Sequence, residues 1–160
     1  MTWVEFQSRL RGTLRSLGDH SVLIVTAPSD EAGYVQFIVD EDTLFAEASG
    51  PEFVGGAAAH DADDLTMLAA GWTAPTRPLP NWSFGLSLPA LTSEYAELAD
   101  RCAVALRDVF HVEHPGSLGY RAWREPETQP PGVTWSAERI ERLDPGENPL
   151  LLPELGLQPV

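Results

Sequence analysis

Residues 21–49 read SVLIVTAPSDEAGYVQFIVDEDTLFAEAS, and they contain the strongest β-strand signals of the chain. Its middle part, YVQFIVD at 34–40, is rich in the aromatic and β-branched residues that suit a pleated surface. Similar short runs lie at 21–27 and 43–49, separated from it by 28–33 and by an Asp-Glu-Asp corner. Connections this short join neighbouring antiparallel strands. The stretch therefore predicts a three-strand meander.

Side chains alternate between the two faces of a strand, so each run has two different sides. The side expected to form the core is apolar and consists of Val35, Phe37, Val39, Leu44, Ala46 and Ala48. The other side mixes aromatic, aliphatic and polar groups, as recognition surfaces do, and consists of Tyr34, Gln36, Ile38, Phe45 and Glu47. These five are the candidate partner-binding residues. The alternative is that a helix or the leucine-rich tail covers them.

The composition fits one domain and argues against several classes of partner. With 160 residues, 43% of them hydrophobic, the chain is long enough to bury a core. It has 24 acidic and 10 basic residues and a formal net charge of −14, which repels phosphate backbones and anionic lipids. We therefore expect neither nucleic acid nor membrane as a partner. A solvated acidic surface needs no electrostatic function to explain it.

The cysteine count and the N-terminus indicate a cytoplasmic location. A single cysteine, Cys102, excludes an internal disulfide framework and fits a reducing compartment. The first residues lack the basic start and apolar run of a signal peptide. All ten basic residues are arginine, and with 14 prolines and 13 glycines this indicates a GC-rich bacterial genome.

Helices and two further strands are expected around the meander. Residues 2–17 form a helix, because Thr2 and Glu5 have capping-box spacing and apolar residues recur every three or four positions. Helices are also expected at 60–70 and 93–111, and strands at 81–88 and 118–123. The predicted class is α+β, in the order α-β-β-β-α-β-α-β. Helices 2–17 and 93–111 are expected to pack on one face of an antiparallel sheet.

The composition changes after residue 123. Residues 124–160 contain seven of the 14 prolines and seven acidic residues against three arginines. We therefore expect a domain at 1–123 and an acidic, proline-rich extension at 124–160, mostly irregular, with a short helix at 136–143.

Catalytic motifs are scarce. His111 and His114 flank Glu113, and two imidazoles three residues apart can share a metal. However, Pro115 follows at once, so these residues mark a helix end, and no other Cys or His lies nearby in the sequence. Cys102 lies on the apolar side of a predicted helix, where cysteine is usually a small hydrophobic residue. We expect no catalytic residues, no metal and no cofactor.

A family resemblance adds to this interpretation. The residues that carry it are Trp3-x-x-Phe6 with Leu10 and Leu14, Tyr34-Val35-Gln36-Phe37, Leu44-x-Ala46-Glu47, Leu68-Ala-Ala-Gly71-Trp72-x-x-Pro75, Asn81-Trp82, and Leu106-Arg-Asp-Val109-Phe110 with His114-Pro115. This set resembles the bacterial TY-Chap domains, chaperone-like peptide-binding modules similar to type III secretion chaperones and to YbjN-like proteins. The resemblance covers about residues 1–123.

The resemblance implies a non-enzymatic chaperone or adaptor that binds a protein or peptide client, such as a secreted effector or toxin. Type III chaperones commonly dimerise, so a homodimer is among the expectations, and the extension could occupy the groove that a client would use. Two other functions stay open. One is an acidic immunity protein that neutralises a basic toxin, and the other is a small metal-dependent enzyme that uses His111, Glu113 and His114.

Overall fold

A computed structural model describes residues 1–28, 33–50 and 61–160. Most of the connection predicted at 28–33 and the first residue of the helix predicted at 60–70 lie outside these ranges. The helices are α1 (Trp3–Ser16), α2 (Asp61–Ala70), α3 (Thr92–Val104) and α4 (Ala137–Glu141). The strands are β1 (Ser21–Thr26), β2 (Tyr34–Asp40), β3 (Thr43–Ala48), β4 (Trp82–Ser87), β5 (Gly119–Arg124) and β6 (Gln158–Pro159). The predicted α+β class and the order of the first eight elements are confirmed.

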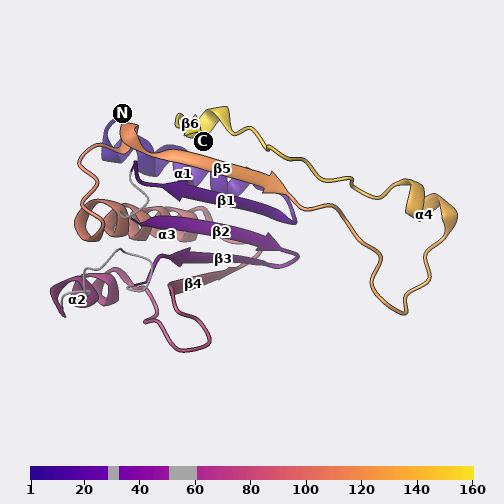
Figure 1. Ribbon diagram of the computed structural model, residues 1–160, viewed down its shortest axis with the longest axis horizontal. Helices are drawn as coiled ribbons and strands as arrows, with labels where there is room; N and C mark the ends of the chain where they lie inside the picture. The colour runs from indigo at the N-terminus through magenta and orange to yellow at the C-terminus, as the bar shows by residue number, and fades with distance from the viewer. Residues whose placement is uncertain (29–32, 51–60) are drawn as a thin grey trace.

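The strands form one sheet in the order β4-β3-β2-β1-β5-β6 (Figure 1). The predicted meander is present, with Leu23 opposite Phe37 on β1 and β2, and Phe37 opposite Ala46 on β2 and β3. β5 pairs with β1, so three strands separate it from β4 although β4 is the strand that precedes it in the sequence. All pairs are antiparallel except β5 with the short β6, which is parallel.

The predicted N-terminal helix is α1, and its cap has the predicted chemistry. The Thr2 hydroxyl accepts a hydrogen bond from the Glu5 amide at 3.2 Å, and the Glu5 carboxylate accepts one from the Thr2 amide at 2.6 Å. The bond from the Thr2 amide lowers the pKa of Glu5, because it stabilises the charged carboxylate. One side of the helix buries Phe6, Leu10 and Leu14.

The long helix predicted at 93–111 is α-helical only as far as Val104. Residues Ala105–Val109 form a π-helical turn, in which the Phe110 amide donates to the Ala105 carbonyl at 2.8 Å. Phe110 is buried and lies against Gly33, where a Cβ atom would come within 2.9 Å of the ring. A π turn contains only one residue more than an α turn. The spacing of apolar residues in the sequence therefore did not distinguish the two.

The core lies between one face of the sheet and the helices, as predicted. Figure 1 shows α1 and α3 together behind the sheet. The buried face of the strands consists of Leu23, Val25, Val35, Phe37, Val39, Leu44, Ala46, Ala48, Trp82, Leu86, Tyr120 and Ala122. The helices contribute Leu10 and Leu98, both fully buried. This face is therefore sealed by the chain itself.

Residues 125–160 leave the sheet at the end of β5, extend to α4 and return to the same strand (Figure 1). The backbones of Arg124 and Glu147 exchange hydrogen bonds of 2.8 and 2.9 Å, and the Arg124 guanidinium binds Asp144 at 2.6 Å. The hydrogen bonds from Arg124 lower the pKa of the Asp144 carboxyl. Further along, Leu155 is fully buried in the core, close to α1. The returning chain thus covers the outer edge of β5.

No helix among the described residues is long and apolar enough to cross a membrane.

Candidate functional site

The five candidate binding residues lie together on the face of the sheet that points away from α1 and α3. Gln36 is opposite Glu47, and Ile38 is opposite Phe45, in the register of β2 with β3. We call this side of strands β1–β5 the open face. Among the described residues, no helix lies on it (Figure 1). The returning tail follows the β5 edge instead.

An apolar row crosses the open face at right angles to the strands. The pairing registers place Trp123, Val22, Ile38 and Phe45 side by side on β5, β1, β2 and β3, and we call these four residues the apolar row. Ile38 is 37% exposed, Trp123 and Phe45 are half-buried, and Val22 between them is buried. Adjacent strands are about 4.8 Å apart, so the row is about 14 Å long. Gly85 follows on β4 and leaves open space beside Phe45.

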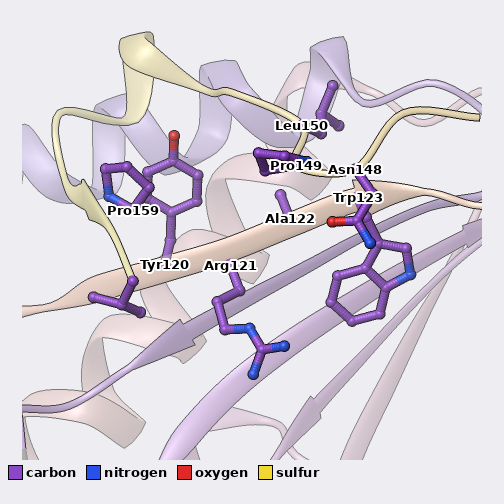
Figure 2. Close-up of a pocket in the computed structure, with 9 residues that line it drawn as sticks. Tyr120, Arg121, Ala122, Trp123, Asn148, Pro149, Leu150 and Pro159 are labelled. Atoms are coloured by element: carbon purple, nitrogen blue, oxygen red, sulfur yellow. The ribbon is translucent and has the colours of Figure 1, made fainter.

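Figure 2 shows how β5 contributes to this face. Arg121 and Trp123 project from β5 over the neighbouring strands, whereas Tyr120 and Ala122 point to the opposite side. The Tyr120 hydroxyl accepts a hydrogen bond from the Leu152 amide at 2.9 Å, and the Ala122 carbonyl accepts one from the Leu150 amide at 2.8 Å. The tail therefore holds β5 from the edge and the buried side. Asn148 and Pro149 of the tail line a hollow together with Trp123, which stays half-buried.

A hydrogen-bond network fixes the polar candidates on one side of the apolar row. The Gln36 amide donates to the Glu47 carboxylate. The Asn81 amide donates to the Tyr34 hydroxyl at 3.2 Å and to Glu47 at 3.5 Å, and its carbonyl oxygen accepts from the Gly50 amide at 3.0 Å. Because these side chains hold one another, this part of the face is a preformed surface.

Carboxylates border the other side of the apolar row. We call Asp19, Asp40, Glu41, Asp42 and Glu125 the acidic rim. Asp40 is two residues beyond Ile38 on the same side of β2, and Glu125 is two residues beyond Trp123 at the end of β5. The Asp19 carboxylate connects the start of β1 to the turn between β2 and β3. It accepts hydrogen bonds from the Glu41 amide at 2.7 Å and the His20 amide at 2.9 Å.

A shallow hollow of about 360 Å³ lies where the apolar row meets the acidic rim. Ile38 and Phe45 form its apolar wall, and it is completed by Asp40, Glu41, Asp42 and Thr43. We call it the rim hollow. It lies at the end of the sheet that carries the turn between β2 and β3.

The structure does not gather the candidate catalytic residues into a site. His111, Glu113 and His114 are exposed after the π turn. Among the described residues, the one group of three acidic, histidine or cysteine side chains within reach of a shared metal is Asp19, His20 and Asp40. Burial raises the pKa of the Cys102 thiol, which disfavours the nucleophilic thiolate.

The two edges of the sheet leave few backbone groups free to pair with an added strand. On β4, the backbones of Thr73 and Ser83 exchange hydrogen bonds of 2.9 and 3.1 Å. Only Gly85 and Ser87 then remain on that edge without a backbone partner among the described residues. The β5 edge is covered by the tail.

Residues 1–124 match the family described as T3SS (YopN, CesT) and YbjN peptide-binding chaperone 3, or TY-Chap3. The chain belongs to the TY-Chap3 family. Comparisons with curated proteins and with solved structures find no match. The resemblance noted in the sequence is confirmed, and the family is one of peptide-binding chaperones. The match ends at Arg124, the last residue of β5.

The residues that β1 and β5 contribute to the open face were not predicted from the sequence. Trp123 and Arg121 had a usable signal, because they alternate with the apolar residues Tyr120 and Ala122. Val22 had none, since residues 22–25 are all aliphatic and do not reveal which side faces the core. The position of β5 beside β1 is what brings Trp123 into the apolar row.

Proposed function

We propose that this TY-Chap3 domain binds an extended segment of a client protein on its open face, and that it acts by binding and not by catalysis. The observation that carries the proposal is the apolar row. It crosses four strands, and the described part of the chain leaves Ile38 exposed and Trp123 and Phe45 partly exposed, although the opposite face is sealed. A contiguous apolar patch on the exposed surface of a protein marks an interaction site.

The two ends of the row are suited to be its anchors. Trp123 and Phe45 are large aromatic side chains, the type that contributes most to binding energy at interfaces. Phe45 lies on β3, which is paired with β2 and β4, and Trp123 lies on β5, which is paired with β1. The Trp123 indole N–H already donates to the Glu125 carboxylate. A surface whose side chains are fixed in this way loses little conformational entropy when a client binds.

Binding on the face is better supported than binding on an edge. Strand addition needs a row of free backbone groups. The β4 edge offers Gly85 and Ser87, and the β5 edge is occupied by Glu147, Leu150 and β6. We therefore place the client across the strands, with the tail beside it on the β5 edge.

The family name connects the fold to type III secretion, so we extend the proposal to a secreted effector or toxin as the client. An immunity protein would bind one folded toxin with high affinity. A chaperone tolerates several unfolded segments, and the match to a family of peptide-binding chaperones favours the second behaviour.

Phe45→Arg tests the proposal. The substitution places a charge in the apolar row, so binding to an array of short peptides from bacterial secreted proteins should be lost. Because Phe45 is on the open face, the unfolding midpoint should change by no more than about 2 °C. The control is Leu91→Arg, at an exposed position before α3 that is outside the open face. Retained binding by the Phe45 variant would refute the assignment, and an unfolded variant would show that Phe45 belongs to the core.

A further inference from the structure

We propose that the client segment carries an arginine or lysine whose side chain occupies the rim hollow, next to apolar residues that lie along the apolar row. This inference rests on the proposed function and specifies the chemistry of its client. It follows from three properties of the open face: the lining of the hollow, the charge around it, and the spacing of the row.

The lining of the rim hollow is divided in the way that a long basic side chain is. Ile38 and Phe45 provide the apolar part of the lining, and Asp40, Glu41 and Asp42 provide its acidic part. Lysine and arginine have aliphatic stems that pack on apolar surface while the charged group stays in contact with water or a counter-ion. A purely apolar side chain would leave the carboxylates without a partner, and an acidic one would be repelled.

The charge around the rim hollow is not neutralised by the described part of the chain. Several other carboxylates have an arginine partner: Asp108 binds Arg107 at 2.6 Å, and Asp144 binds Arg124 at 2.6 Å. Among the described residues, the rim has only His20, which lies 3.3 Å from Asp19 and 3.9 Å from Asp40. Glu41 and Asp42 have no basic partner there. The chain as a whole carries a net charge of −14, so the field extends beyond the contact and favours a basic client.

The spacing of the row fits an extended segment that starts in the hollow. Side chains on one side of an extended chain recur about every 6.7 Å. From Phe45 to Trp123 is three strand spacings, or about 14 Å, which corresponds to positions i and i+4. A basic residue at i would therefore place the residue at i+2 near Val22 and Ile38, and the residue at i+4 near Trp123. The expected client motif is basic-x-apolar-x-apolar.

The test uses labelled peptides in which arginine, isoleucine and tyrosine occupy alternate positions between serines. In a second peptide citrulline replaces arginine, which keeps the size and removes the charge, and in a third glutamate replaces it. Fluorescence anisotropy measures each affinity for the full chain. We expect the arginine peptide to bind about tenfold more tightly than the citrulline peptide, the effect of one partly exposed charge contact, and the glutamate peptide to bind most weakly.

Protein variants identify the hollow as the source of the preference. In Asp40→Asn with Asp42→Asn, the preference for the arginine peptide should fall clearly below tenfold, and Glu41 and the net charge of the chain should keep a small part of it. The matched control is Glu138→Gln with Glu141→Gln, which removes the same charge from exposed positions on α4 and should keep the tenfold preference. Phe45→Arg should abolish binding of all three peptides.

Each other outcome overturns the inference. Equal binding of the arginine and citrulline peptides, still abolished by Phe45→Arg, would refute the basic residue and leave the proposed function intact. A tenfold preference that persists undiminished in the Asp40/Asp42 variant would place the charge contact elsewhere. Sedimentation that shows a dimer dissociated by Phe45→Arg would assign the row to a second copy of the chain. Failure of all three peptides to bind would refute the inference and the proposed function together.

Discussion

Leu155→Ala tests whether the C-terminal segment beyond the family match is part of the core. Leu155 is fully buried and belongs to the same cluster as Leu10 and Leu98. The substitution removes three carbon atoms, which corresponds to about 2.4 kcal/mol of lost burial at about 0.8 kcal/mol for each carbon. The residual cavity adds to this, and measured values for such changes range from about 2 to 5 kcal/mol. We expect the free energy of unfolding to fall by about 3 kcal/mol.

Thermal unfolding monitored by circular dichroism measures this effect. For a chain of this size, about 3 kcal/mol lowers the midpoint by about 6–12 °C. Leu151→Ala is the matched control, because Leu151 is 61% exposed and its truncation should change the stability by less than about 0.5 kcal/mol. If both variants unfold at the same temperature as the parent protein, the tail does not contribute to the core, and the covered β5 edge is wrongly described.

Two further predictions concern groups whose pKa is shifted. Hydrogen bonds from Arg124 lower the pKa of Asp144 from its ordinary value of 3.8. The contact between the tail and β5 is therefore stabilised at neutral pH and loses this contribution as the pH falls below 3.8. Hydrogen-exchange protection of the Glu147 amide should therefore decrease in acid, and a pH-independent protection factor would contradict the ion pair. Cys102 is buried with a raised pKa, so a thiol reagent should label it only in denaturant, and rapid labelling of the native protein would refute its burial.

The local elements were predictable because each had a strong short-range signal. The alternation at 34–40 determined which residues face the core, and the capping box at Thr2 and Glu5 determined where α1 begins. The same alternation placed Ile38 and Phe45 on one surface before any tertiary information was available. Short-range patterns of this kind depend only on the geometry of the strand or helix itself.

The remaining features depend on contacts between residues far apart in the chain. Nothing in the sequence of β5 shows that it pairs with β1, yet this pairing adds Trp123 to the candidate site. The composition after residue 124 does not reveal that Glu147 pairs with Arg124 or that Leu155 enters the core. The rim hollow likewise requires the turn between β2 and β3 to lie beside the apolar row. Such features depend on tertiary contacts, which local sequence propensities do not predict.

An NMR titration with the arginine peptide shows whether a client binds on the open face. Binding there should shift the Val22 and Ile38 methyl signals and the Trp123 indole N–H signal, with the signals of the core residue Leu98 unchanged. Shifts confined to the Gly85 and Ser87 amides would instead place the peptide on the β4 edge and refute binding on the open face.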